Sequence, residues 1–186
     1  RDFCLSRGLG DVYKRQPLVK GTEDMLFKAD YAFRRVTDIT PEFLLKNNIK
    51  GLLLDLDNTL TTHDNPVPGK GVEEWLKEMK DFGIKLIIVS NNHPERVKPF
   101  ADMLKLDFIS EGKKPLSNGF NRAQLKLNIP FSQLAVVGDQ IFTDILGANL
   151  RNVRGIFVYP IEHENTRFFK LKRWVEKPFL PKLQNE

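Results

Sequence analysis

Two aspartates, Asp55 and Asp57, follow directly on a short apolar run that begins at Gly51. Side chains two residues apart point the same way while a strand continues. If the chain turns after Asp55, Asp57 can present its backbone carbonyl where Asp55 presents its carboxylate. Such a set of oxygens suits a hard cation, and Mg²⁺ fits it best. Taken alone, an Asp-x-Asp pair after a strand is more often a turn with helix-capping aspartates.

Polar residues elsewhere in the sequence would complete a site of this kind. Asp139 and Asp144 add two carboxylates. Ser90, with backbone amides at a helix start, can hold phosphate oxygens, and Lys114 adds a positive charge. Together these groups predict phosphoryl transfer, in which one carboxylate attacks phosphorus, a second carboxyl protonates the leaving oxygen, and a metal and a lysine offset the charge. Expulsion of a halide would not need the proton donor that Asp57 supplies.

The predicted elements would bring these residues together. Apolar strands alternate with amphipathic helices, which predicts an α/β fold with a doubly wound parallel sheet covered on both faces. In such open sheets, ligands bind beyond the carboxyl ends of the strands. Strands are expected at 51–56, 84–89, 108–109, 134–137 and 155–159, and helices that begin near 41, 72, 94, 120 and 141. The stretch from 17 to 49 is interpreted as helix and connection.

The motifs resemble those of the haloacid dehalogenase (HAD) superfamily. The resemblance rests on four motifs in order: Asp-Leu-Asp-Asn-Thr at 55–59, Ser90, Lys114-Pro115, and Gly-Asp-Gln-Ile-Phe-Thr-Asp at 138–144. The form of the last motif is similar to that of subfamily IIIA phosphatases. The stretch from about 30 to 174 resembles the YqeG family, which is similar to mitochondrial phosphatidylglycerophosphate phosphatases.

The resemblance implies a role for each motif residue in a Mg²⁺-dependent phosphomonoester hydrolase. Asp55 would be the nucleophile that forms an aspartyl-phosphate, and Asp57 the general acid and then the base that activates water. The implied Mg²⁺ ligands are the Asp55 carboxylate, the Asp57 carbonyl, Asp139 and Asp144, the last directly or through water.

The remaining motif residues would bind the phosphoryl group or support the loop. Ser90 and Asn91 would bind phosphoryl oxygens, and Lys114 would pair with Asp55 and the phosphate. Lys114 is preferred to Lys113 because it precedes proline, as in the family pattern. Thr59 would fix the loop by hydrogen bonding at the substrate site.

The sequence leaves no room for a cap domain over this site. About a dozen residues separate Thr59 from the helix near Val72, and only one helix and one strand fit between Ser90 and Lys114. The enzyme is therefore expected to be capless. An open site would accept a phosphate carried on something large, such as a lipid surface, a protein or a nucleic-acid end.

The composition is that of a globular protein. The 186 residues suffice for one hydrophobic core, and 41% hydrophobic with 28% charged residues lies outside the disordered range. No apolar stretch approaches the roughly 20 residues of a transmembrane segment, and no apolar segment near the start is typical of a secretory signal. Cys4 is the only cysteine, which excludes an internal disulfide. A cytoplasmic protein is expected.

The net charge of +5 is concentrated at the two ends. Residues 1–16 carry a net charge of +2 and residues 167–186 one of +4, so the rest is nearly neutral. A nucleic-acid-binding protein usually has a basic face on its folded body, so nucleic acid is not an expected partner. Residues 1–16 lack periodicity and are expected to be a non-native or disordered leader. The phosphatase domain is assigned to 17–165, with 166–186 as its basic amphipathic tail.

The tail is open to two interpretations. Apolar residues fall on one side of a predicted helix among lysines and arginines: Phe168, Leu171, Trp174 and Val175. A helix of this kind suits peripheral contact with an anionic membrane. The preferred alternative is that its aromatic side packs on the body.

The substrate expected from the resemblance, the open site and the tail is phosphatidylglycerophosphate at the inner face of a membrane. A soluble nucleotide, sugar or phosphoprotein substrate is the second hypothesis. The third is a non-catalytic module on the same fold that binds RNA or a ribosomal particle.

Overall fold

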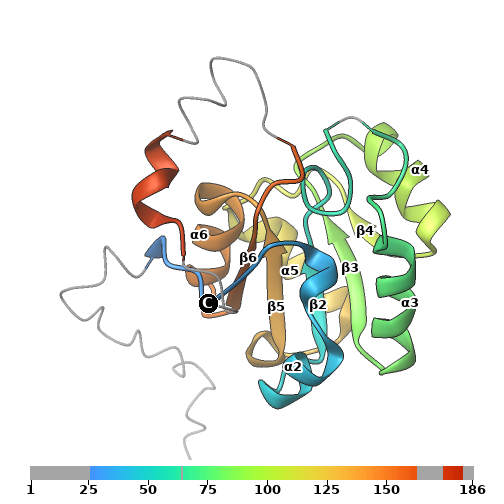
Figure 1. Ribbon diagram of the computed structural model, residues 1–186, viewed down its shortest axis with the longest axis horizontal. Coiled ribbons are helices and arrows are strands. Elements are labelled where there is room, and N and C mark those ends of the chain that lie inside the picture. Colours follow the sequence, from blue (N-terminus) through green and yellow to red (C-terminus); the bar gives the residue numbers. More distant parts are fainter. Residues whose placement is uncertain (1–25, 64, 163–173, 182–186) are drawn as a thin grey trace, which may run out of the picture.

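A six-stranded sheet forms the centre of the molecule (Figure 1). The computed structural model describes residues 26–63, 65–162 and 174–181. All neighbouring strands are parallel, in the order β1-β6-β5-β2-β3-β4. The strands are β1 (Tyr31–Phe33), β2 (Gly51–Leu54), β3 (Lys85–Val89), β4 (Asp107–Ile109), β5 (Leu134–Gly138) and β6 (Arg154–Val158). The predicted parallel sheet is confirmed.

Helices cover both faces of this sheet. The elements are η1 (Val36–Asp38), α2 (Pro41–Lys46), α3 (Val72–Asp81), α4 (Pro94–Leu104), α5 (Ser117–Leu127), η2 (Phe131–Gln133), η3 (Ile141–Ile145), α6 (Leu146–Asn149) and η4 (Lys177–Phe179). The apolar side chains of α2, α3 and α4 pack on one face, and those of α5 and α6 pack on the other. The result is the doubly wound arrangement expected from the sequence.

Alternation along each strand explains why both faces are apolar. In β2, Leu52 and Leu54 belong to the core under α3 and α4, whereas Leu53 belongs to the core under α5. A central strand of a parallel sheet is buried on both faces, so all its residues are apolar. The four residues of β2 are buried accordingly.

Local signals set the start of the second helix. Thr40 precedes α2 and its hydroxyl oxygen accepts a hydrogen bond from the Phe43 amide at 3.2 Å. Pro41 occupies the first helical position, where a missing amide hydrogen costs nothing. The predicted threonine cap and proline start are both present.

The prediction was wrong for the edge strand β1. Residues 31–33 were expected to lie in helix or connection, but they pair with Ile156, Phe157 and Val158 of β6. Asp30 extends this pairing, since its amide donates to the Gly155 carbonyl at 2.9 Å. A three-residue strand has too few positions for a periodic pattern. It exists because β6 offers it a hydrogen-bonding edge.

The expected helix from 141 to 150 has two parts. Its first turn, η3, is a π-helical turn, and α6 follows it directly. A single π turn of this kind is frequent at functional sites because it re-aims the side chains that it carries. Here it carries Asp144, the last residue of the fourth motif.

The two ends are described only in part. The leader at 1–16 and most of the basic tail lie outside the described residues. In the described part of the tail, Trp174 is 69% exposed and Val175 is 41% exposed. The predicted packing of this aromatic side on the body is therefore not found at Trp174. Within residues 26–63, 65–162 and 174–181, no helix is long and apolar enough to cross a membrane.

Candidate active site

The predicted site residues meet at the carboxyl edge of the sheet. Asp55 follows β2, Ser90 follows β3 and Asp139 follows β5, and these three strands are neighbours. Lys114 enters from the connection between β4 and α5, and Asp144 enters from η3. Chain segments that are distant in sequence thus supply one site, as expected for an open α/β sheet.

Three carboxylates form a buried cluster at this edge. Asp55, Asp139 and Asp144 each offer an oxygen, and these oxygens lie within 4.8 Å of one another. All three residues are buried. Buried carboxylates at such spacing repel one another unless a cation lies between them. The cluster therefore has the donor atoms and the charge for a hard divalent cation.

Lys114 partly neutralises this cluster. Its Nζ donates a hydrogen bond to Asp55 Oδ1 and another, of 2.7 Å, to Asp144 Oδ1. Burial alone would lower the pKa of Lys114, but the charges of Asp144 and Asp55 outweigh burial and hold the pKa above its ordinary value. Lys114 is thus a permanent cation. Three carboxylates against one ammonium still leave two negative charges within this group.

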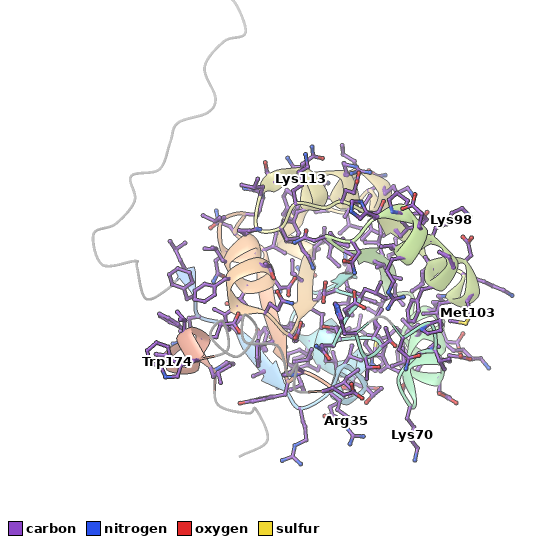
Figure 2. The ribbon with its side chains drawn as sticks, turned by 90° about the horizontal axis from the view of Figure 1, so that it is seen from above. Arg35, Lys70, Lys98, Met103, Lys113 and Trp174 are labelled. Atoms are coloured by element: carbon purple, nitrogen blue, oxygen red, sulfur yellow. The ribbon has the colours of Figure 1, made fainter. Side chains whose placement is uncertain are left out.

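The neighbouring Lys113 has no such contact. Lys113 is exposed, and Figure 2, which looks down on this edge of the sheet, places it at the periphery. The side chain of Lys114 is only 3% exposed. The structure therefore places the second of the two lysines in the site, in agreement with the assignment from the proline that follows it.

The same burial perturbs Asp55. Loss of solvation raises the pKa of Asp55 to about 6, against the lowering effect of Lys114, and the charges of Asp144 and Asp57 raise it further. A carboxylate held in this way is poorly solvated by water. It is therefore available as a nucleophile or as a metal ligand.

Close packing against a glycine fixes the position of Asp144. A Cβ on Gly138 would overlap the Asp144 carboxyl, so only glycine fits at the end of β5. The amide of Gln140 donates to Asp144 Oδ2 at 3.2 Å. The Glu176 carboxylate, from the C-terminal segment, accepts hydrogen bonds from the Ile141 and Phe142 amides at 3.0 and 3.5 Å. The start of the turn and the Asp144 side chain are thereby held.

Asp57 lies outside this cluster and has partners of its own. Arg96 Nη2 donates to Asp57 Oδ1 at 2.8 Å, and Asn92 Nδ2 donates to Asp57 Oδ2. The chain turns directly after Asp57, because Asn58 adopts a left-handed conformation with φ of 62°. This left-handed residue lies after Asp57, whereas the sequence analysis expected the chain to turn after Asp55.

The predicted phosphate-binding residues mostly support the backbone. The Asn91 side chain accepts from the Lys114 amide at 2.7 Å and donates to the Lys114 carbonyl at 3.2 Å. Ser90 Oγ accepts from the Asn92 amide at 3.1 Å. The binding of phosphoryl oxygens by Ser90 and Asn91 remains a prediction.

Thr59 does not make the hydrogen bond that was expected to fix the loop. Its Oγ1 is buried and has no hydrogen-bond partner among the described residues. The loop is held instead by backbone bonds such as that from Leu60 to Leu56, of 2.9 Å. An assignment of Thr59 to the substrate site remains a prediction.

The sequence analysis missed Arg96, Asn92 and Glu176. Arg96 carried a usable signal, because it lies in the first turn of α4. A cation at that end of a helix is disfavoured by the helix dipole, so its presence suggests a nearby anion. Glu176 had no comparable signal, since its contact with η3 spans 35 residues of sequence.

Known proteins share this sequence and this fold. The family model for haloacid dehalogenase-like hydrolases matches residues 64–150, which include Ser90, Lys114, Asp139 and Asp144. The probable phosphatase YqeG of Bacillus subtilis (strain 168) is 38% identical over 160 residues, which span 86% of this chain and 93% of that protein. The chain belongs to the haloacid dehalogenase-like hydrolases.

Solved structures agree on the architecture of this hydrolase. A haloacid dehalogenase-like hydrolase from Brucella suis 1330 has a TM-score of 0.52 at 10% identity, over 68% of this chain and 93% of that one. An uncharacterized protein from Listeria monocytogenes serotype 4b has a TM-score of 0.52 at 23% identity, over 63% and 85% of the two chains. At these identities the likeness concerns the fold alone.

The predicted enzyme class is confirmed. The family match and the curated relative identify a hydrolase of the haloacid dehalogenase phosphatase type. The capless form of the fold agrees with the described chain. Between β2 and α3, the described residues form loop, turn and one isolated bridge between Asp57 and Thr61, and between β3 and Lys114 they add only α4 and β4.

Proposed function

We propose that this hydrolase is a Mg²⁺-dependent phosphomonoesterase that works through an aspartyl-phosphate on Asp55. The observation that carries the proposal is the cluster of Asp55, Asp139 and Asp144 around Lys114. Three buried carboxylates against one lysine make a site at which a divalent cation would offset negative charge. Oxygen donors at this spacing suit Mg²⁺. In the proposal, Asp139, Asp144, the Asp55 carboxylate and the Asp57 carbonyl hold the ion, whose chemistry is to offset charge on the phosphoryl oxygens.

The first half of the reaction forms the covalent intermediate. A carboxylate oxygen of Asp55 attacks phosphorus while the bond from phosphorus to the leaving oxygen breaks. Asp57 enters this step with a proton on its carboxyl group and gives that proton to the leaving oxygen, so the substrate departs as an alcohol. Lys114 pairs with charge on Asp55 and on the phosphoryl group. Ser90 and Asn91, at the end of β3, are the proposed ligands of the remaining phosphoryl oxygens.

The second half returns the enzyme to its starting state. Water enters where the alcohol left, and Asp57 takes a proton from it. The water oxygen bonds to phosphorus as the bond to Asp55 breaks, which releases inorganic phosphate. One carboxyl two residues from the nucleophile thus serves as acid and then as base.

The proposed substrate is phosphatidylglycerophosphate at the inner face of a membrane. Two features support a lipid-borne substrate. The described part of the chain places no cap domain over the carboxyl edge, and Trp174 and Val175 are exposed next to a basic stretch of sequence. An open site can reach a headgroup that stays in its membrane, and exposed aromatic residues favour the interface.

Phosphate release is the test of this proposal. Phosphatidylglycerophosphate in mixed micelles would be compared with soluble nucleotide, sugar and protein phosphoesters, with and without Mg²⁺. The Asp55→Asn protein serves as the blank. Strong preference for the lipid supports both substrate and location, whereas preference for a soluble ester keeps the mechanism and removes the membrane. No Mg²⁺-dependent release from any ester would favour a binding module on the same fold.

A further inference from the structure

The general acid Asp57 is held from one side by the segment that follows β3. Arg96 donates to Oδ1 and Asn92 donates to Oδ2, so both carboxylate oxygens have a partner. The Asp57 side chain is 12% exposed and the Arg96 side chain is 19% exposed. This ion pair is therefore largely shielded from water and is not a solvated surface contact. A pair of this kind holds its geometry more firmly than an exposed one.

Arg96 is itself fixed at three points. Besides Asp57, its Nη2 donates to the Asn65 carbonyl at 3.0 Å, and its guanidinium carbon lies 5.7 Å from the centre of the Phe100 ring. The bonds to Asp57 and Asn65 join α4 to the loop that follows Asp55, whereas the Phe100 contact lies within α4. Arg96 is thus a brace between two chain segments, and Asp57 lies at one end of it.

The position of Arg96 in the first turn of α4 also indicates that its bond to Asp57 matters. A cation in the first turn of a helix opposes the helix dipole. Residues at that turn are more often acidic or neutral, and Glu95 next to it follows this rule. An unfavourable placement of this kind is compensated here by the bond to Asp57.

We propose that Arg96 is the positioning residue for Asp57, an inference that rests on the proposed phosphatase mechanism. The alcohol leaves from, and water enters at, the same side of phosphorus, opposite Asp55. One fixed position of Asp57 therefore serves both steps, and a misplacement of about 1 Å is enough to lose much of the rate. The charge-assisted bond to Arg96 makes Oδ1 the anchor. Oδ2, whose partner is the neutral amide of Asn92, is the oxygen that exchanges its partner for the substrate.

Substrates with different leaving groups test this role. An alkyl phosphate, glycerol phosphate, needs a proton on its leaving oxygen, whereas p-nitrophenyl phosphate leaves readily as the anion. Release of the alcohol or phenol would be measured in a single turnover for the wild type, Arg96→Gln and Arg96→Lys. We expect Arg96→Gln to slow release from the alkyl ester by about 100-fold and from the aryl ester by less than about 3-fold. Arg96→Lys keeps the positive charge but loses the planar guanidinium, so its rate on the alkyl ester should lie between those of the wild type and Arg96→Gln.

A control on the same helix separates position from charge. Lys98 lies on the exposed side of α4 and pairs with Asp102 on the surface (Figure 2). Lys98→Gln removes one cation from α4 and should leave both rates unchanged. A second variant, Asn92→Ala, removes only the partner of Oδ2 and should slow the alkyl ester less than Arg96→Gln does. It also provides the test if the Arg96→Gln protein does not fold, since an unchanged ratio of alkyl to aryl rates in Asn92→Ala and Arg96→Lys would overturn the inference.

The outcomes distinguish this inference from the proposed function. Equal losses on both esters in Arg96→Gln would give Arg96 a structural role only and would overturn the inference. A rise in KM confined to substrates that carry a second anion would make Arg96 a substrate ligand instead. A wild-type protein that releases phosphate from neither ester would refute the phosphatase mechanism itself.

Discussion

Two carboxylates that stand two residues apart, Asp55 and Asp57, are held in different ways. Asp55 lies among two further carboxylates and shares one lysine with Asp144. Asp57 has an arginine and an amide as its partners. The first group sets three carboxyl groups against one lysine, whereas Asp57 has one arginine and one amide to itself. The two aspartates belong to one sequence motif, but the structure gives their side chains separate sets of partners.

The difference teaches which part of the site depends on a metal. The cluster around Asp55 sets three buried carboxyl groups against one lysine, so in the proposed mechanism a divalent cation offsets its negative charge. Both carboxylate oxygens of Asp57, in contrast, have hydrogen-bond partners that the protein itself supplies, Arg96 and Asn92. Mg²⁺ should therefore change the stability and titration of the Asp55 cluster and leave the two side-chain hydrogen bonds of Asp57 unchanged, although the Asp57 carbonyl is a proposed ligand of the ion.

The largest expected effect separates the two aspartates chemically. Asp55→Asn removes the proposed nucleophile and should lower phosphate release by at least about 10⁴-fold. Asp57→Asn keeps the nucleophile and loses the base, so p-nitrophenyl phosphate should still form an intermediate that hydrolyses slowly. Mass spectrometry of the acid-quenched protein should detect a phosphoryl adduct on Asp57→Asn and none on Asp55→Asn. An adduct on the Asp55→Asn protein would refute the assignment of the nucleophile.

A second prediction concerns the lysine that Asp55 shares. Lys114→Met leaves three buried carboxylates without their cation, and we expect a loss of about 3–5 kcal/mol in the free energy of unfolding. Urea denaturation in the presence of a chelator measures it, and saturating Mg²⁺ should recover part of the loss. Lys113→Met is the matched control, because Lys113 is exposed. Similar losses of unfolding free energy in the two variants would mean that the buried ion pairs of Lys114 do not stabilise the protein more than an exposed lysine does.

The third prediction is the pH dependence of the Asp55 cluster. Because burial raises the pKa of Asp55 to about 6 from 3.8, the unfolded chain loses this proton first as the pH rises. The metal-free protein should therefore lose stability between pH 4 and 6, by roughly 3 kcal/mol at most from this group. Protons compete with the metal below pH 6, so stabilisation by Mg²⁺ should be larger at pH 7.5 than at pH 5.

Thermal unfolding at several pH values, with and without Mg²⁺, measures this effect. Asp55→Asn provides the control, because it removes the titrating carboxyl and should flatten the response near pH 6. Equal stabilisation by Mg²⁺ at pH 5 and pH 7.5 in the wild type would contradict the prediction.

The same comparison shows how far sequence reasoning reaches. The position of Asp55 followed from the hydrophobic pattern, since an apolar strand in a parallel sheet ends at the edge where ligands bind. Ser90 and Asp139 followed by the same rule. That these residues share one edge of the sheet could be expected from this rule, whereas the adjacency of β2, β3 and β5 is seen only in the structure.

The partners of Asp57 and the edge strand did not follow from that pattern. Arg96 reaches Asp57 across 39 residues of sequence, and no periodicity specifies which acid a helix residue will meet. Strand β1 has three residues, too few to show an alternation. Both features depend on tertiary packing, which local propensity does not encode.

The smallest expected effect concerns Glu176, which supports the turn that carries the proposed metal ligand Asp144. Glu176 accepts from the Ile141 and Phe142 amides at the start of the turn that carries Asp144. Glu176→Ala leaves these amides without their acceptor and should cost about 1–3 kcal/mol. Glu78→Ala, on the exposed face of α3, should stay within about 0.5 kcal/mol of the wild type. Because Glu176 supports Asp144 and not Asp57, its loss should weaken Mg²⁺ binding and leave the ratio of alkyl to aryl ester rates unchanged. A change in that ratio would show that the two sites around Asp55 and Asp57 are coupled after all.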